Sequence, residues 1–382
     1  MPPIEDAGGG AGAVLSIDLA AIVANYRLLC RRLGGVECAT VVKADAYGLG
    51  MHRVAPALAR AGCRQFFVAR LDEGVALRRL MPEAAIGVFD GALPGTEPVY
   101  REHHLMPVLN HLGQVDAWAA LAARRRRPLP AILHVDTGMT RLGLEPAEVD
   151  RLAEDPGRLA GIELSYVMSH LACADEPGHE MNARQLATFT QARRRLAQAP
   201  ASLANSSGIF LGPDYHFDLA RPGAALYGVA PQPGTPNPMA QVINLKGKIL
   251  QVRNVDSPMT VGYGATHRVT RAGRLATVAV GYADGYLRSL SNRAHAFLGD
   301  VRVPVVGRVS MDLITLDVTA APPRAARPGQ WVDLLGPRHG VDALAAEAGT
   351  IGYEILTALG HRYHRVYVET PGKHRASVHN GR

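Results

Sequence analysis

The sequence has few aromatic residues and few cysteines. Aromatic side chains make up 5% of the 382 residues, so the core has to be built mainly from Ala, Val, Leu and Ile. The four cysteines have no CxxC spacing, which argues against a zinc site of the finger type. In a chain of this length we expect them to be buried, reduced thiols. The sequence therefore predicts no metal centre. The four cysteines are Cys30, Cys38, Cys63 and Cys173.

Long apolar runs are also missing. No segment reaches the ~20 apolar residues of a membrane-spanning helix. The N-terminal stretch MPPIEDAGGGAGAV is acidic and glycine-rich, whereas a signal peptide is basic and then apolar. We therefore expect a cytoplasmic protein that does not interact with membranes. Residues 1–13 and 371–382 are predicted to be disordered.

The net charge of +7 raises the question of a nucleic-acid partner. Most of the excess is scattered arginine, and the one dense run, 124–127, lies between a helix-like segment and Pro128. A solvated helix end accounts for such a run, because cations are favoured there. No basic motif is interleaved with aromatic residues, so we expect no nucleic-acid binding.

The chain does contain a regular alternation of apolar strand-like runs with segments of helical periodicity. Strands that alternate with helices require right-handed parallel crossovers. Eight such strands fit a (β/α)8 barrel better than an open doubly wound sheet. No GxGxxG follows the first strand, which argues against a dinucleotide-binding fold. The predicted strands are 36–42, 65–69, 85–89, 106–109, 131–135, 163–168, 202–205 and 218–223.

The pattern changes after about residue 240. From there the apolar runs are of the β type and are separated by Gly, Pro, Asn and Asp, with one helix-like segment near 341–348. The proline-rich stretch PQPGTPNPM (231–239) has the composition of a linker. The sequence thus predicts an α/β protein with an N-terminal (β/α)8 TIM-type barrel over 14–240. A mainly β C-terminal domain over 241–370 is predicted to follow.

Polar residues follow the carboxyl ends of the predicted barrel strands, where the active sites of such barrels lie. A single lysine at a strand end is more often a surface residue with its amine in water. Convergence of several segments at one mouth of the barrel favours a catalytic site instead. These residues are Lys43 after the first strand, Asp136, Thr137 and Arg141 after the fifth, His170 after the sixth, Asn205 and Ser206 after the seventh, and Arg221 in the eighth.

The segment around Lys43, VVKADAYGLG (41–50), resembles the pyridoxal-phosphate lysine motif of alanine racemases. The same fold family includes ornithine-type decarboxylases and small pyridoxal-phosphate-binding proteins, but VGYGAT and GRVSMD resemble racemase features. The resemblance extends in order through HVDTGMTRLG (134–143), SHLACAD (169–175), ANSSG (204–208), RPGAALYG (221–228), VGYGAT (261–266), VGYADGYLR (280–288), GRVSMD (307–312) and GTIGYEIL (349–356).

The resemblance implies a pyridoxal-phosphate enzyme that interconverts L- and D-alanine and supplies D-alanine for peptidoglycan. Two alternatives remain open. One is a broad-specificity racemase acting on serine or lysine, and the other is a non-catalytic carrier of pyridoxal phosphate. A carrier needs Lys43 and a phosphate loop, but it has no use for Tyr263 or Arg141.

The residues that would hold the cofactor can be assessed by their chemistry. An aldehyde reacts only with an unprotonated amine, and desolvation beside cationic groups lowers the pKa of a lysine such as Lys43. A phosphate in this type of barrel lies at the loops after strands seven and eight. There Ser206 offers a hydroxyl and Gly223 a close backbone approach, although both also fit ordinary turn chemistry.

The resemblance adds further cofactor contacts. It implies that Tyr47, Asn205 and Tyr353 take part in cofactor binding, and that Arg221 contacts the pyridine nitrogen with His170 behind it. An arginine only donates hydrogen bonds, so it would leave that nitrogen unprotonated. The ring would then withdraw electrons more weakly, which favours prompt return of the α-proton over transamination.

Racemisation exchanges a proton on both faces of the α-carbon, so a base is needed on each face. The resemblance assigns these roles to Lys43 and to Tyr263, the latter from the partner subunit of a head-to-tail homodimer. It also implies that Arg141 and Met311 contact the substrate carboxylate. Tyr282 and Tyr353 resemble residues that narrow the entrance, which would explain a preference for alanine.

One position departs from the family. Relatives commonly have a lysine where this chain has His134, and that lysine can carry a carbamate that orients the counterpart of Arg141. Imidazole forms no stable carbamate of this kind. Either a neutral His134 accepts a hydrogen bond from Arg141, or a bound anion takes the place of the carbamate.

Overall fold

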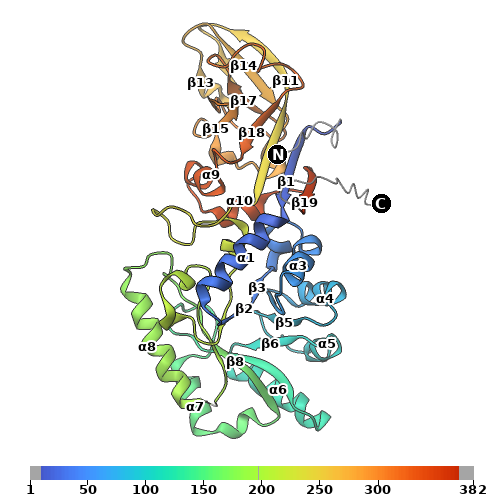
Figure 1. The fold of residues 1–382 in the computed structure, drawn as a ribbon, viewed down its shortest axis with the longest axis vertical. Coiled ribbons are helices and arrows are strands. Elements are labelled where there is room, and N and C mark those ends of the chain that lie inside the picture. Colours follow the sequence, from blue (N-terminus) through green and yellow to red (C-terminus); the bar gives the residue numbers. More distant parts are fainter. Residues whose placement is uncertain (1–9, 197, 370–382) are drawn as a thin grey trace. The chain divides into compact units, whose positions relative to one another are not determined.

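The computed structural model describes residues 10–196 and 198–369 (Figure 1). The chain divides into two compact units, Val23–Met239 and a second unit made of Met1–Ile22 together with Ala240–Arg382. The predicted disordered segment 371–382, and 1–9 of the segment 1–13, lie outside the described residues. Ala13, which was also expected to be disordered, is the first residue of a strand.

Short parallel strands form the sheet of the first unit. A seven-stranded sheet runs in the order of the sequence from β3 to β9, and β10 pairs in parallel with β2. The eight predicted barrel strands are therefore confirmed, with β2 and β3 as two halves of the first, interrupted at Ala39. The strands are β2 (Glu37–Cys38), β3 (Thr40–Val41), β4 (Gln65–Val68), β5 (Ala85–Val88), β6 (Met106–Leu109), β7 (Leu129–His134), β8 (Ile162–Met168), β9 (Ala201–Ser202) and β10 (Leu219–Ala220).

Backbone hydrogen bonds close this sheet into a barrel. Arg221 N donates to Ala204 O at 2.8 Å, just after β10 and β9, and Ala39 N donates to Ala220 O at 3.0 Å, between β2 and β10. Because β2 and β3 belong to one strand, the two bonds connect the last strand with both of its neighbours. The fold is the predicted (β/α)8 TIM-type barrel.

Helices alternate with these strands (Figure 1). The predicted N-terminal cap of the first helix is confirmed, since Asp18 Oδ1 accepts a hydrogen bond from Ala21 N at 2.8 Å. The helices are α1 (Leu19–Leu33), α2 (Lys43–Tyr47), α3 (Met51–Arg60), α4 (Leu71–Leu80), α5 (Glu97–Glu102), α6 (Leu112–Arg125), α7 (Pro146–Glu154) and α8 (Glu180–Arg195), with 3-10 turns η2 (Pro156–Leu159), η3 (Gly208–Phe210), η4 (Pro213–Tyr215) and η5 (Ala224–Tyr227).

The second unit is mainly β, as predicted. Its main sheet has the order β16-β15-β18-β11-β1-β19, and β14 pairs with both β11 and β17. The strands are β1 (Ala13–Asp18), β11 (Ile243–Val255), β12 (Thr260–Val261), β13 (His267–Arg268), β14 (Gly273–Val278), β15 (His295–Leu298), β16 (Val301–Pro304), β17 (Ile314–Asp317), β18 (Trp331–Leu335) and β19 (His364–Val368). The helices are α9 (Val341–Ala348) and α10 (Gly352–Ala358), with 3-10 turns η6 (Tyr263–Ala265), η7 (Tyr282–Asp284) and η8 (Arg288–Leu290).

Two predictions about this unit were wrong. Residues 14–18 were assigned to the barrel, but they belong to β1, which pairs antiparallel with β11 and parallel with β19. The error arose because the partners of β1 lie more than two hundred residues away, where local pattern gives no information about pairing. A single late helix was expected, whereas Gly349, with φ of 71°, ends α9 and a second helix, α10, follows.

Three further expectations concerned the exposure of the basic run, the burial of the cysteines and the length of the helices. The basic run 124–127 is exposed at the end of α6, as predicted. All four cysteines are free thiols, but only Cys38 and Cys63 are buried, and Cys30 and Cys173 are half-exposed. Among the described residues, no helix is both long and apolar enough to span a bilayer.

Candidate active site

The chain makes an unusual turn directly after Lys43, at the carboxyl end of β3. The four residues from Ala44 to Tyr47 all have positive φ, between 51° and 55°, although none is glycine. Left-handed backbone costs ~1–2 kcal/mol per residue, and such strain concentrates at functional sites. Two carboxylates hold the turn, because Glu73 Oε1 accepts from Ala44 N at 2.6 Å and Asp45 Oδ1 from Met51 N at 2.7 Å. The backbone around Lys43 is thereby fixed.

The Lys43 amine lies in a setting that favours its neutral form. Burial lowers its pKa, and the positive charge of Arg141 lowers it further, while Glu73 and Asp90 act in the opposite direction. Its Nζ is 5.9 Å from the centre of the Phe89 ring. The depressed pKa is the property expected of a lysine that reacts with an aldehyde.

Arg221 lies at the end of β10 with 3% of its surface exposed. Its Nη2 donates to Ser169 O at 2.6 Å and its Nη1 donates to Ser202 Oγ. Among the described residues, the buried Nε has no hydrogen-bond partner. Burial lowers the pKa of Arg221 to about 9, so the guanidinium is still protonated at neutral pH. A charged donor left unpaired in this way costs ~1–3 kcal/mol, and it suits an acceptor without a proton, such as a pyridine nitrogen.

His134, at the end of β7, is held in one tautomer by Asn110. The Asn110 amide nitrogen donates to Phe89 O at 2.9 Å and to Val108 O at 3.0 Å, so its oxygen is the atom that lies 2.8 Å from His134 Nδ1. Nδ1 therefore carries the hydrogen and Nε2 keeps its lone pair. Burial, and then the charge of Arg221, lowers the pKa of His134 to about 4. The imidazole is a neutral acceptor.

His170 was predicted to hold Arg221. It is half-buried, and desolvation followed by the charge of Arg221 brings its pKa well below the usual range, so it too is neutral. The hydrogen bonds that position Arg221 come from Ser169 and Ser202, which the sequence analysis did not identify. Gln185 links helix α8 to the loop after β8, since its Nε2 donates to His170 O at 2.8 Å.

Three of the predicted cofactor residues converge after β9 and β10. A Cβ on Gly223 would overlap the Tyr47 hydroxyl, so only glycine allows this approach. Ser206 Oγ accepts from Gly223 N at 3.0 Å and Ala225 N at 3.2 Å, and these bonds do not use the hydroxyl hydrogen. Nearby, Asn205 Oδ1 accepts from the backbone at 2.9 Å and shapes the turn. This cluster of hydroxyls and amides has the chemistry that a phosphate requires.

Arg141 is exposed in a loop whose backbone is organised by Asp136. The Asp136 Oδ1 atom accepts hydrogen bonds from the amides of Gly138, Met139 and Thr140 at 2.9, 3.0 and 3.2 Å. The loop therefore has a defined path although it lies at the surface, and its arginine is available to an anionic group.

The remaining predicted site residues belong to the second unit and are large side chains on its surface. Tyr263 is 73% exposed, Met311 54%, Tyr282 42% and Tyr353 39%. The backbone amide of Tyr282 donates to Ser310 O at 3.0 Å, which brings Tyr282 beside the segment of Met311. Tyr282 and Met311 thus form a pair of neighbouring exposed apolar side chains, which is typical of a surface that another molecule covers.

Comparison with known proteins agrees with this geometry. The chain matches the model "Alanine racemase, N-terminal domain" over residues 17–231 and "Alanine racemase, C-terminal domain" over 242–367. It is 56% identical to an alanine racemase of Rhodospirillum rubrum, with 94% of this chain and 96% of that protein covered. It is 53% identical to a catabolic alanine racemase of Mesorhizobium japonicum, with 96% and 95% covered.

Solved structures give the same result. The alanine racemase of Bartonella henselae, which was crystallised with covalently bound pyridoxal phosphate, is 41% identical with a TM-score of 0.91. That match covers 94% of this chain and all of the other. The biosynthetic alanine racemase of Pseudomonas aeruginosa is 34% identical with a TM-score of 0.88, again over 94% and 100%. From its fold, its barrel-end residues and these matches along nearly its whole length, the chain belongs to the alanine racemase family.

Proposed function

We propose that the protein is a pyridoxal-phosphate-dependent alanine racemase that interconverts L-alanine and D-alanine. The observation that carries this proposal is the buried Arg221, whose protonated Nε lacks a partner among the described residues. When bound, the cofactor would supply an electron-withdrawing ring that acidifies the α-proton of the substrate. Lys43 would hold the cofactor covalently, and the cluster of Tyr47, Ser206 and Gly223 would hold its phosphate.

Arg221 would set the strength of that ring. Its Nε–H can only donate, so a pyridine nitrogen beside it has no proton and withdraws electrons less than a protonated one. The α-carbon then recovers its proton before other chemistry intervenes. Ser169 and Ser202 keep the guanidinium in place, and the neutral His170 adds no second charge beside it.

His134 would act as a positioning residue for Arg141. A neutral imidazole whose Nε2 carries a lone pair can accept a hydrogen bond from a guanidinium, but it repels an anion. Of the two alternatives for this position, the tautomer fixed by Asn110 thus favours direct support of Arg141. Arg141 would then present its charge to the carboxylate of alanine.

Tyr263 would be the second base, opposite Lys43, and would come from the partner subunit of a homodimer. The support is its 73% exposure together with that of Met311, Tyr282 and Tyr353, which a partner chain would cover. In this arrangement Met311 contacts the substrate carboxylate, while Tyr282 and Tyr353 narrow the entrance to the size of alanine.

The decisive test follows the optical rotation of L-alanine, L-serine and L-lysine with the purified protein. Rapid loss of rotation with alanine alone supports the proposal. Comparable rates with serine or lysine indicate a broad-specificity racemase. Binding of pyridoxal phosphate without any racemisation indicates a carrier protein.

We further propose that the enzyme works in the cytoplasm and supplies D-alanine for peptidoglycan, which is consistent with its four free thiols. Expression in a bacterium that requires external D-alanine should restore growth without it. Growth only in the presence of D-alanine, despite an active enzyme in the lysate, would contradict this role. Cell fractionation tests the location.

A further inference from the structure

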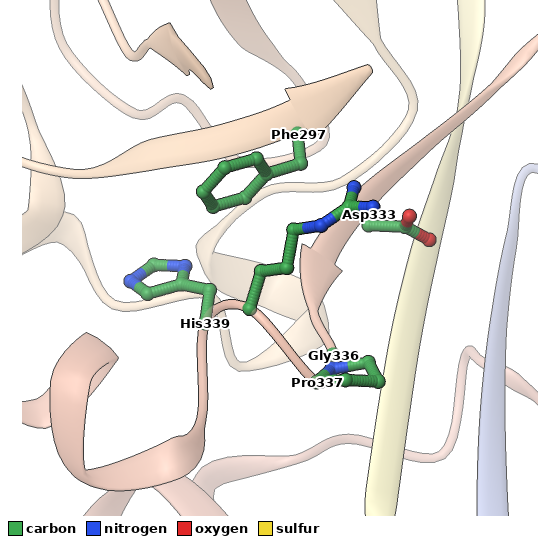
Figure 2. Close-up of a pocket in the computed structure, with 6 residues that line it drawn as sticks. Phe297, Asp333, Gly336, Pro337 and His339 are labelled. Carbon is green, nitrogen blue, oxygen red and sulfur yellow. The ribbon is translucent and has the colours of Figure 1, made fainter. Parts of the chain in front are cut away.

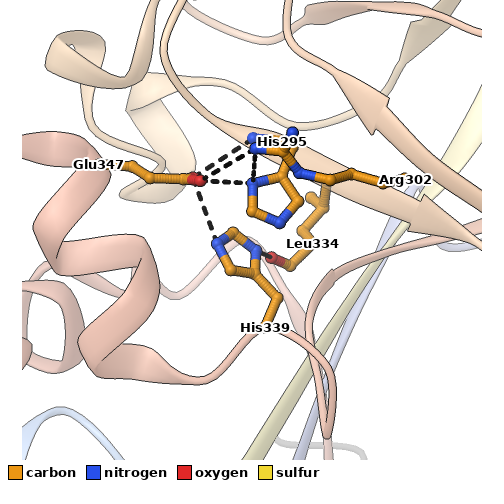
Figure 3. A network of polar contacts seen from close by, with 5 residues as sticks. All are labelled: His295, Arg302, Leu334, His339 and Glu347. Atoms are coloured by element: carbon orange, nitrogen blue, oxygen red, sulfur yellow. Dashed lines mark hydrogen bonds and ion pairs between the residues drawn. The ribbon is translucent and has the colours of Figure 1, made fainter.

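A cluster of two histidines and a glutamate lies in the second unit, among residues to which the proposed racemase function assigns no role. His295 begins β15, His339 immediately precedes Gly340 and helix α9, and Glu347 lies near the end of α9 (Figure 3). One ligand atom from each lies within 4.8 Å of the others. We propose that these three side chains bind one divalent transition-metal ion of the zinc type.

The ligand atoms point at a common place. Glu347 Oε1 contacts His295 Nδ1, and Glu347 Oε2 lies 3.2 Å from His339 Nε2 (Figure 3). Zinc binds histidine nitrogen and carboxylate oxygen at ~2.0–2.2 Å in tetrahedral geometry, so two ligand atoms of one ion are ~3.3–3.6 Å apart. Ligand atoms within 4.8 Å of one another therefore need to approach by at most ~1.5 Å, which side-chain rotation can supply.

The tautomer of His339 leaves a place for a cation. His339 Nδ1 lies 3.2 Å from Leu334 O and must donate to it, so in the neutral ring Nε2 carries a lone pair. That lone pair faces a carboxylate oxygen, and among the described residues Nε2 makes no hydrogen bond. The His339 side chain is only 2% exposed, so this lone pair is held away from solvent. A metal ion between the two atoms removes the repulsion.

The surroundings also fit a metal site. Metal-binding histidines usually donate their second nitrogen to a carbonyl or carboxylate, as His339 does to Leu334. The carboxylate is oriented by the backbone amide of His295, which donates to Glu347 Oε2 at 3.3 Å. Arg302 Nη2 lies 3.1 Å from His295 Nδ1 and 3.9 Å from Glu347 Oε1, so its charge opposes an ion and it has to leave the ligand atom, but its side chain is 63% exposed and can turn into solvent.

A cavity adjoins the cluster. It has a volume of about 220 Å³ and includes His339 in its wall (Figure 2). Rotation of the His339 side chain would connect the cluster with this cavity, from which water could complete the coordination of an ion. The bound ion would join β15, the turn before α9 and α9 itself, so it would stabilise this unit. The residues that line the cavity are Phe297, Asp333, Gly336, Pro337, Arg338 and His339.

The test uses the full-length protein, loaded with its cofactor and freed of metal by a chelator. Zn²⁺ is titrated against a colorimetric competitor, and Co²⁺ is added separately to record the visible bands of a tetrahedral site. Glu347→Gln keeps the shape of the side chain but removes its charge. His339→Asn keeps a donor for Leu334 O but removes the ligand nitrogen. The control is His361→Asn, at an exposed position remote in sequence from the cluster.

We expect the unaltered protein to bind one Zn²⁺ per chain with a dissociation constant of about 1 µM or tighter. Both cluster variants should bind at least about 100-fold more weakly, and His361→Asn should not change. Excess Zn²⁺ should raise the Tm of the unaltered protein by about 3 °C or more, and should not do so in the variants. These readouts do not depend on racemase activity.

Absence of a saturable one-to-one site overturns the proposal, and so does unchanged affinity in both cluster variants. Circular dichroism establishes that each variant is folded. If Glu347→Gln is unfolded, His339→Asn alone decides the outcome, because it retains the hydrogen bond to Leu334.

Discussion

The two units differ in how their candidate site residues are held. In the barrel, two polar groups of the candidate site are buried and fixed: Arg221 is 3% exposed and donates hydrogen bonds to two serines, and the neutral His134 is held in one tautomer. In the second unit, Tyr263 and Met311 lie on the surface, more than half exposed. The barrel therefore orients these groups by itself, whereas the second unit presents exposed groups that, in our proposal, a partner chain would cover.

This difference teaches how each unit should respond to change. Substitution of a group that is preorganised by burial should change catalysis and stability within a single chain. Substitution of an exposed group should affect catalysis only once two chains have assembled. The following experiments test that distinction, beginning with the largest expected effect.

Lys43→Ala should lower racemisation of alanine by about 10³-fold or more, because it removes both the amine that holds the cofactor and one base. Treatment with borohydride followed by mass spectrometry should find pyridoxal attached to the unaltered chain and not to the variant. Lys246→Ala is the control, since Lys246 forms an ion pair with Asp333 in the other unit. A borohydride-fixed cofactor in Lys43→Ala would refute the assignment.

Tyr263→Phe should lower activity by about 10²–10⁴-fold while leaving the folded chain intact, because the side chain is exposed and only its hydroxyl is lost. Tyr263→Phe and Lys43→Ala chains, co-expressed with different tags and isolated as a mixed dimer, should regain up to about half of the activity per dimer. One of the two sites would then have both bases. A fully inactive, verified mixed dimer means that Tyr263 is not a base from the partner chain.

Arg221→Glu should raise the ratio of pyruvate formed to alanine racemised by about tenfold, a change equivalent to ~1.4 kcal/mol. A carboxylate can keep a proton on the ring nitrogen, which makes the ring a stronger electron acceptor. Arg221→Lys is the matched variant, because it keeps the charge without the planar Nε–H. An unchanged ratio in Arg221→Glu would count against the proposed contact.

The pH dependence of stability should reveal the burial of His134. His134 has a pKa of about 4 in the folded chain against about 6.5 in an unfolded one. Below pH 6.5 the unfolded state therefore binds more protons, and stability falls as pH decreases towards 4. The full effect is ~3 kcal/mol for this residue. Denaturant unfolding between pH 7 and 4 should show a shallower decline in His134→Asn, and identical slopes would contradict the buried neutral imidazole.

Ala44→Gly should give the smallest effect of these substitutions. It should raise the stability of the protein and lower its racemase activity. Glycine accepts the positive φ of this position, so stability should rise by ~0.5–1 kcal/mol, while the looser turn slows racemisation a few-fold. Ala61→Gly, where φ is −77°, should instead lower stability. Thermal unfolding and initial rates measure both. Lower stability in Ala44→Gly would mean that the turn is not strained.

Much of the fold could be predicted from local patterns. Each barrel strand is a short run of apolar residues, and in each barrel helix the apolar residues recur with helical spacing. All eight barrel strands and the exposed end of α6 follow from such local patterns. The assignment of β1 failed for the converse reason, since the hydrogen bonds of a strand to distant partners leave no trace in its own sequence. Helix α10 was missed for another reason, since it is only seven residues long and shows too little of a helical period.

The site was predictable where a side chain carries the chemistry itself. Lys43, Arg221 and Ser206 lie at strand ends, and the barrel architecture brings such ends together. Supporting residues such as Glu73 and Asn110 carry no distinctive motif, and only their contacts show that they hold a turn or a tautomer. The left-handed backbone after Lys43 was unpredictable as well, because none of its four residues is a glycine.

The pairing of β1 has a consequence for how the protein is made. On the ribosome, Ala13–Asp18 emerges before the barrel segments, but its partner β11 begins only at Ile243 and β19 at His364. At ~5–20 residues per second, the strand waits for tens of seconds while the barrel segments are synthesised. During that time its apolar residues have no sheet to join. The main sheet of the second unit can therefore be completed only after β19 has been synthesised, and until then an exposed β1 is a segment that a chaperone would protect.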